Sequence, residues 1–338
     1  MDKKTTLNEV GPRDWRFSHM TSPPTKDVYQ VIRMLEKAGI ERVEIGASVN
    51  YDRYPYMSDT FELLSDLKEN RGARYSVYVG PYAKNYPKNK IKKLLDTGKL
   101  KENPGMPDEI SFSISASEKR NIGLYGLSGN QVFDNIRRHI DRAKEDGVKY
   151  FRGYVSAAFG YENPSDSPIG SVIGWSQMLF DLGCYEVALG DSRGYAVPGE
   201  FSKKWNMMKS HLPLEKIALH FHENNYINWE TDIVNVLRDG VCVFDTSIMD
   251  IMRPVSTNKR QITMYNDDAP PNASTEYANY FLSKQLNEVG NIELMDRTGY
   301  DEISTGLNYD AVCEAGKFIR ESISGCNQPL IARWPKNF

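Results

Sequence analysis

The chain has 338 residues, of which 40% are hydrophobic and 26% are charged. These values lie close to globular averages and exclude collagen-like, coiled-coil and intrinsically disordered proteins. The length fits either one large α/β barrel or two ordinary domains. The 42 Lys and Arg residues nearly balance the 45 Asp and Glu residues, and no basic stretch interleaves with aromatic residues, so nucleic acid is not an expected partner.

The first residues, MDKKTTLNEVGPRD, contain no apolar run of the secretory-signal type. No stretch of the chain approaches the roughly 18 consecutive apolar residues that span a bilayer. We therefore expect a soluble, cytoplasmic protein without a membrane partner. Its four cysteines form no CxxC pair, so we expect neither disulfides nor a zinc–thiolate site.

Eight short runs rich in Val, Ile, Tyr and Ser are typical of β-strands, and segments with helical periodicity separate them. The runs are TLNEVGPRD, RVEIGAS, RYSVYVG, EISFSIS, YFRGYVS, YEVALGD, KIALHFH and VCVFDTS. We expect their carboxyl ends at Asp14, Glu44, Gly80, Ser117, Ser156, Asp191, His222 and Thr246. This regular alternation predicts an α/β fold, a (β/α)8 TIM barrel.

Glycines mark the expected ends of four helices, each directly before a strand. They are Gly39, Gly147, Gly183 and Gly240, and a glycine at this place is typical of a left-handed helix C-cap. The chain has neither GxGxxG after a strand nor GxxxxGK[ST]. A nucleotide cofactor is therefore not expected.

The chain after the eighth strand has a different character. Residues 248–271 contain three prolines and no glycine, which predicts a long loop over the barrel mouth. We expect residues 1–300 to form the catalytic barrel domain. Residues 301–338 are expected to form a C-terminal helical extension that packs on it.

Two histidines lie at strand spacing near the end of the seventh strand. Residues i and i+2 of a strand point to one face, so His220 and His222 are expected to project together into the barrel mouth. Asp14, at the end of the first strand, would complete a set of two histidines and one carboxylate for a divalent metal. Core histidines and a structural Arg13–Asp14 ion pair are the alternatives.

Further polar residues are expected at the same barrel end. Glu44 and Asp191 end predicted strands, where they could donate a proton, orient a ligand or anchor a helix. Ser48, Asn121 and Arg152 are weaker candidates for substrate binding, and a structural role for each is equally open.

Several segments resemble one enzyme family in the same order along nearly the whole chain. They are NEVGPRD, AGIERVEIGAS, SISASEKRNI, FRGYVSAAFG, LGCYEVALGDSRGYAVPG, LHFH and TGLNYDAVCEAGKFI. The chain resembles the 3-hydroxy-3-methylglutaryl-CoA lyase family, within the DRE-TIM metallolyases, whose barrels are pyruvate carboxyltransferase-like.

The resemblance implies roles for individual residues. Arg13 matches the arginine that polarises the substrate carbonyl and stabilises the enolate. Asp14, His220 and His222 match metal ligands, Asn272 matches the fourth ligand, and Glu44 matches a glutamate of the second strand. The ligand types suit Mg²⁺, Mn²⁺, Co²⁺ or Zn²⁺ equally. Family members are commonly homodimers.

The implied reaction is retro-Claisen cleavage of a 3-hydroxy-3-carboxyalkyl thioester through a metal-stabilised enolate. The expected partner is thus a small molecule, such as an acyl-CoA. One alternative is a Claisen-condensing enzyme or aldolase that joins an acyl donor to a 2-oxo acid. Another is a metal-binding barrel that has lost catalysis.

The chain departs from the family pattern at three places. One is the sequence Glu-Asn-Asn-Tyr at residues 223–226, where the family has an acidic residue and a small turn that ends in glycine. The family also has a glycine-rich loop with a catalytic cysteine before the fourth ligand, but this chain has neither glycine nor cysteine there. Candidates for the missing proton carrier are His220 first, and then Glu44, Asp250, Tyr265 and His19. The third departure is the bulky sequence Trp-Arg-Phe at residues 15–17, which replaces a glycine-containing turn.

Overall fold

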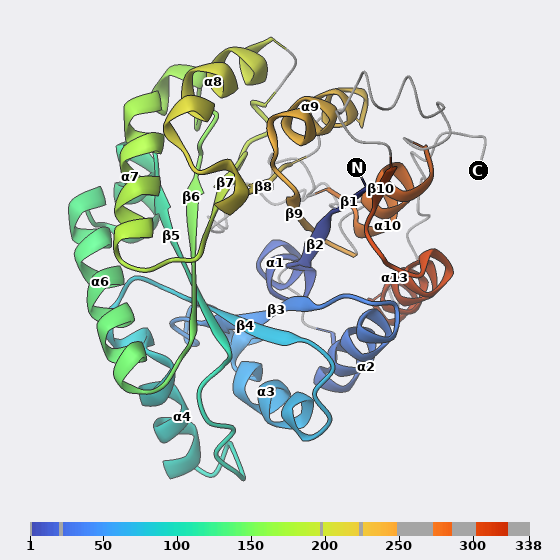
Figure 1. The fold of residues 1–338 in the computed structure, drawn as a ribbon. Helices are drawn as coiled ribbons and strands as arrows, with labels where there is room; N and C mark the ends of the chain where they lie inside the picture. Colours follow the sequence, from blue (N-terminus) through green and yellow to red (C-terminus); the bar gives the residue numbers. More distant parts are fainter. Residues whose placement is uncertain are drawn as a thin grey trace, which may run out of the picture.

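The computed structural model describes residues 2–19, 23–196, 199–222, 226–248, 273–285 and 302–323. Eight parallel strands form a closed barrel in chain order (Figure 1), and β9 pairs with β2 to close it. They are β2 (Thr6–Glu9), β3 (Arg42–Ser48), β4 (Arg74–Val79), β5 (Glu109–Ser115), β6 (Tyr150–Ser156), β7 (Glu186–Gly190), β8 (Ile217–His220) and β9 (Val243–Thr246). The predicted TIM barrel is confirmed.

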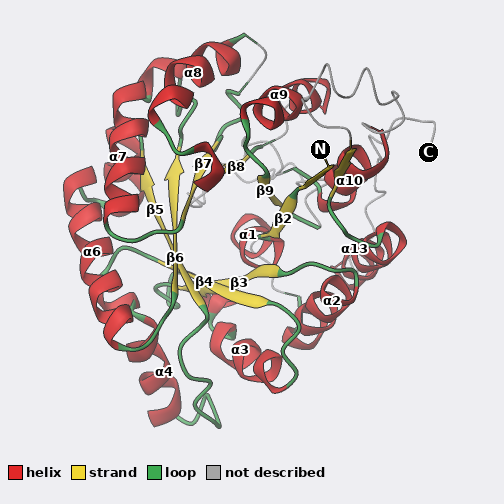
Figure 2. Cartoon of the chain, in the orientation of Figure 1, coloured by secondary structure: helices red, strands yellow, loops and turns green. Residues whose placement is uncertain are grey.

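Helices surround the strands, as Figure 2 shows in red. They are α1 (Gly11–His19), α2 (Thr25–Lys37), α3 (Thr60–Glu69), α4 (Pro87–Asp96), α5 (Glu118–Tyr125), α6 (Gly129–Glu145), α7 (Ile169–Asp181), α8 (Glu200–Met208), α9 (Tyr226–Asp239), α10 (Thr275–Tyr280) and α13 (Tyr309–Ile323). Among these described helices, none is long and apolar enough to cross a membrane.

The four predicted glycine caps are confirmed. Gly39, Gly147, Gly183 and Gly240 have φ of +103°, +81°, +100° and +108°, a region that residues with a Cβ rarely adopt. Each glycine reverses the chain directly after a helix. The helix can therefore pack on the barrel while the chain turns into the next strand.

The boundaries expected for the first two strands are wrong. Strand β2 ends at Glu9, and the chain then forms α1, so Arg13 and Asp14 lie in a helix rather than on a strand. Pro12 explains this, because its fixed φ suits the first turn of a helix. Strand β3 continues past Glu44 to Ser48, so Glu44 points into the barrel from within the strand.

The C-terminal part of the described chain returns to the barrel. Strand β10 (Glu302–Ser304) pairs in parallel with β1 (Asp2–Lys4), and α13 packs against α2. Helix α13 therefore packs on the barrel, while the extension over residues 301–338 and the domain boundary at residue 300 stay predictions. Apart from Ile248, the predicted loop 248–271 lies outside the described residues.

Candidate functional site

Three buried side chains converge at the carboxyl end of the barrel. His220 ends β8, His222 follows it, and Asp14 comes from α1; their ligand atoms all lie within 4.8 Å of one another. The Nε2 atoms of the two histidines are 3.2 Å apart. Two ligands about 2.1 Å from one ion, at angles of about 90–110°, are separated by about 3.0–3.4 Å. This donor set therefore fits a divalent cation.

A carboxylate on the neighbouring strand orients His220. Oδ2 of Asp245, on β9, lies 3.2 Å from Nδ1 of His220. When Nδ1–H donates to this carboxylate, the lone pair of Nε2 faces His222, as metal binding requires. Sequence reasoning missed Asp245. The available signal was a charged residue inside the apolar strand VCVFDTS.

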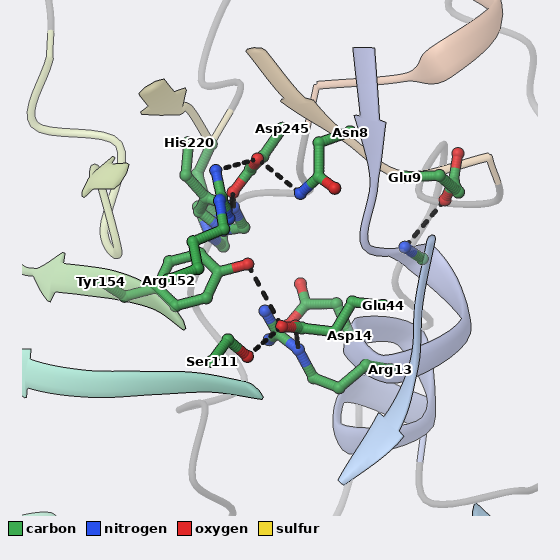
Figure 3. Close-up of polar contacts among 12 residues, drawn as sticks. Asn8, Glu9, Arg13, Asp14, Glu44, Ser111, Arg152, Tyr154, His220 and Asp245 are labelled. Carbon is green, nitrogen blue, oxygen red and sulfur yellow. Dashed lines mark hydrogen bonds and ion pairs between the residues drawn. The ribbon is translucent and has the colours of Figure 1, made fainter. Parts of the chain in front are cut away.

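Asp245 is held in place by two further side chains (Figure 3). The Arg152 guanidinium donates to both carboxylate oxygens, over 3.0 and 2.7 Å, and Asn8 donates over 2.9 Å. Burial alone would raise the pKa of Asp245, but the Arg152 charge and the His220 contact hold it well below its usual range. The carboxylate stays ionised and can orient His220 at any ordinary pH.

Arg152 donates hydrogen bonds to two carboxylates, those of Asp245 and Glu186. Its Nε also donates to Glu186 over 2.6 Å, and its side chain is fully buried. These contacts make Arg152 a support for Asp245. The substrate-binding role expected for Arg152 stays a prediction.

Arg13 reaches from α1 across the barrel interior. Its Nη1 donates to Asp14, and its Nε donates to Glu44, whose other oxygen accepts from Ser111 and, over 3.4 Å, from Tyr154 (Figure 3). The guanidinium carbon also lies 5.6 Å from the centre of the Tyr154 ring. A cation is thereby fixed beside the candidate metal ligands.

These groups share a small cavity of about 40 Å³. Its walls include Arg13, Phe17, Arg120, His220 and His222. The bulky mouth expected from residues 15–17 is present in Phe17, which is buried against this space.

Asp191 lies next to this cavity, but its carboxylate accepts hydrogen bonds from backbone N–H groups. Its two oxygens accept from the N–H groups of Tyr195 and Ala196 over 2.8 and 2.9 Å. Burial raises the pKa of Asp191 to about 7, against these hydrogen bonds. Asp191 does not line the cavity among the residues the structure describes there, and its substrate-binding role stays a prediction.

Ser48 and Asn121 are also engaged away from the cavity. The Ser48 hydroxyl donates to the carbonyl of Asn85 over 2.5 Å. The Asn121 side chain bonds both the N–H and the carbonyl of Ser115, over 2.9 and 3.0 Å. Neither residue is among the described lining residues, and the roles expected for them stay predictions.

Several expected residues fall outside what can be described. Asn272, Asp250 and Tyr265 lie outside the described residues, and so does the side chain of His19. The chain nevertheless resumes beside the histidines, because the N–H of Ala273 donates to the carbonyl of Phe221 over 3.1 Å.

A known protein family matches most of this chain. The HMGL-like family model matches residues 4–228. The chain belongs to the HMGL-like family. Relatives that match the chain include enzymes named as hydroxymethylglutaryl-CoA lyases, which are divalent-metal-dependent carbon–carbon lyases. This match confirms the resemblance found in the sequence and the general class of enzyme. The buried Asp14, His220 and His222 are consistent with that metal dependence.

Family relatives match over nearly their full length. Hydroxymethylglutaryl-CoA lyase YngG of Bacillus subtilis is 26% identical over 98% of this chain and 96% of its own. A 3-hydroxy-3-isohexenylglutaryl-CoA/hydroxymethylglutaryl-CoA lyase of Pseudomonas aeruginosa is also 26% identical, over 94% and 93%. The solved structure of the B. subtilis lyase superposes with a TM-score of 0.75 at 25% identity, covering 98% and 96%.

Proposed function

We propose that this chain is a divalent-metal-dependent lyase that cleaves a 3-hydroxy-3-carboxyalkyl thioester of coenzyme A by a retro-Claisen reaction. The observation that carries the proposal is the convergence of Asp14, His220 and His222 beside the fixed cation of Arg13. Relatives named for hydroxymethylglutaryl-CoA support the substrate class.

Asp14, His220 and His222 would hold the ion, with Asn272 as the expected fourth ligand. A divalent ion at these residues supplies Lewis acidity to a substrate hydroxyl and carbonyl oxygen. Both nitrogens of His220 are then used, one by the ion and one by Asp245. We therefore assign His220 to metal binding rather than to proton transfer.

Arg13 is assigned to the developing negative charge. In the cleavage, a base removes the proton of the 3-hydroxyl, the bond between C2 and C3 breaks, and its electron pair passes to the thioester as an enolate. A proton then adds at C2. The Arg13 guanidinium stabilises the enolate oxygen, and Glu44 positions Arg13. Asp250, Tyr265 and His19 stay predictions for the proton carrier.

Product analysis tests the proposal. Purified, Mn²⁺-loaded protein is incubated with 3-hydroxy-3-methylglutaryl-CoA and the products are identified by mass spectrometry. We expect acetoacetate and acetyl-CoA from the wild type and from the control His211→Ala, which changes an exposed histidine, but not from His220→Ala. Absence of both products from the metal-loaded wild type would overturn this substrate.

The two alternative functions can be tested with the same metal-loaded protein. A condensing enzyme would give a new product from acetyl-CoA and a 2-oxo acid, whereas a barrel without catalysis would retain Mn²⁺ and turn over neither set of substrates. The cytoplasmic location and the homodimer stay predictions.

A further inference from the structure

One buried arginine stands apart from the others. Among the residues the structure describes, four arginines are buried: Arg13, Arg16, Arg120 and Arg152. Arg13, Arg16 and Arg152 each form an ion pair with a carboxylate. Arg120 is 7% exposed and has no carboxylate partner within the described ranges, and its buried Nε has no hydrogen-bond partner there.

Arg120 faces the candidate active site. It lies in the first turn of α5 and lines the same cavity as Arg13, His220 and His222. Its backbone is fixed, because its N–H reaches the hydroxyl of Ser117 over 3.4 Å at the helix N-cap. The guanidinium is therefore delivered to the cavity by a rigid element.

The aromatic ring that Arg120 packs against also carries a second arginine. The guanidinium carbons of Arg120 and Arg193 each lie 5.3 Å from the centre of the Tyr161 ring. A tyrosine ring attracts cations but neutralises none of their charge. Positive charge is thus concentrated around the Tyr161 ring, beside Arg120.

Two acidic residues lie close in sequence to Arg120 or Tyr161, but both contact other groups. Glu162 pairs with Lys119. Glu118 accepts from the N–H of Gly129 over 2.9 Å and from Asn121 over 3.5 Å. Neither carboxylate compensates Arg120.

We propose that Arg120 binds the free carboxylate of the substrate's acyl group, a proposal that rests on the function proposed above. Burial of an uncompensated guanidinium is costly, and a carboxylate is the anion that its planar donor pair matches. Three serines, Ser113, Ser156 and Ser192, also line this cavity and can donate to the same anion. The phosphates of coenzyme A offer the same charge. However, they are many bonds from the thioester that must reach the metal ligands.

Two probes separate the carboxylate from the phosphates. 3-Hydroxy-3-methylglutarate carries carboxylates without phosphate, and coenzyme A carries phosphates without a carboxylate. Titration calorimetry of the Mn²⁺-loaded protein measures both. We expect Arg120→Gln to weaken binding of the acid about 10- to 100-fold, the usual effect of a lost charged hydrogen bond, and to leave coenzyme A binding unchanged.

Matched variants control for charge and folding. Lys119→Gln removes the same charge from the adjacent, exposed residue and is expected to bind the acid like the wild type. Arg120→Lys retains the charge without the planar donor pair and should recover part of the lost affinity. Thermal melting of each variant checks that it is folded.

The outcomes distinguish this proposal from the proposed function. Unchanged binding of the acid by folded Arg120→Gln, loss of coenzyme A binding instead, or a wild type that does not bind the acid would each overturn the role of Arg120. A wild type that binds the acid, loses that binding in Arg120→Gln and yet cleaves no thioester supports Arg120 and overturns the lyase reaction.

Discussion

The carboxylate of Asp245 lies 3.2 Å from Nδ1 of His220 and so turns Nε2 of that ring toward His222. Arg152 holds the same carboxylate with two hydrogen bonds. A buried ion pair of this kind is a rigid support, because neither charge can move to solvent. The orientation of the metal ligand is therefore set by strands β6 and β9 together.

Asp245→Asn tests this support. The amide is uncharged and can present its NH₂ group to His220, so the ring loses its fixed orientation. We expect Mn²⁺ affinity to fall about 10- to 100-fold, the usual effect of losing such a partner. Titration calorimetry measures it, with Asp239→Asn on α9 as the control, since Asp239 contacts Trp205 and Lys209 instead. Equal affinity of the two variants would contradict the role of Asp245.

Glu9 links three separate parts of the chain at the end of β2. Its Oε1 accepts from the N–H groups of Gly11 and Ile248 over 2.8 and 3.0 Å, and its Oε2 accepts from the Thr275 hydroxyl over 2.5 Å. Ile248 and Thr275 flank the segment that contains Asn272. Burial raises the pKa of Glu9 to about 8 from its ordinary 4.5, although the three hydrogen bonds oppose the shift.

Glu9→Gln should change how stability depends on pH. The folded pKa lies above the unfolded pKa, so the stabilising contribution of proton binding is complete below pH 4.5 and is lost as the pH rises through about 8. The glutamine variant should therefore gain stability relative to the wild type over this range. A gain of a few kcal/mol is expected, at about 1.4 kcal/mol per pKa unit.

Urea unfolding of both proteins at pH 5, 7 and 9 measures this difference. Asp191 and Asp232 also have raised pKa values, about 7 and about 8, but both proteins contain them and their contributions cancel in the comparison. A stability difference that stays constant with pH would show that Glu9 is ionised in the folded state.

Most of the barrel could be predicted because its signals are local. Strand runs, helical periodicity and cap glycines such as Gly39 and Gly147 each depend on a few neighbouring residues. Helix α1 was missed because the apolar run before it continues directly into Gly11 and Pro12. The periodicity is too short there to separate a strand from a helical turn.

Part of the candidate site could be predicted because two of its metal ligands lie at a spacing typical of one strand face. His220 and His222 lie two residues apart at the end of one strand, and Asp14 was expected at the same end of the barrel. Asp245 and Arg120 were missed because their importance comes from partners distant in sequence, or from the lack of one. Such relationships exist only after the barrel brings β6, β8 and β9 together.

Gly46 is required by packing rather than by its backbone angles. It lies where the pairing of β3 with β4 shifts register after Glu44, and an added Cβ would lie 2.4 Å from Oγ1 of the buried Thr60. We expect Gly46→Ala to lower the free energy of unfolding by about 1–3 kcal/mol. Gly174→Ala in α7 is the control, because its Cβ meets no atom within 4 Å and should stabilise the helix by about 0.5–1 kcal/mol. The two alanines should thus shift the urea midpoint in opposite directions, and stabilisation by both would contradict the packing argument.

Phe17 narrows the cavity at the barrel mouth. It is 1% exposed, and its ring packs edge-on against Tyr54 and Tyr78, with centroid distances of 5.4 and 6.5 Å. Phe17→Ala should lower the free energy of unfolding by about 3–5 kcal/mol, because the removed ring leaves a hole among rigid aromatic neighbours. Phe17→Leu retains most of the volume and should cost less than about 1.5 kcal/mol. Urea unfolding of the wild type, Phe17→Ala and Phe17→Leu measures the three free energies of unfolding, and we expect them to decrease in the order wild type, leucine, alanine.

The same pair of variants tests whether Phe17 limits the substrate. If the ring fills space beside the metal ligands, its removal should raise kcat/KM for a thioester with a longer 3-alkyl chain relative to the 3-methyl substrate, and Phe17→Leu should raise this ratio less. The ratio cancels any loss of folded enzyme, because both substrates meet the same preparation. An unchanged ratio in folded Phe17→Ala would mean that the 3-alkyl group binds away from Phe17, and that this side chain serves the aromatic cluster alone.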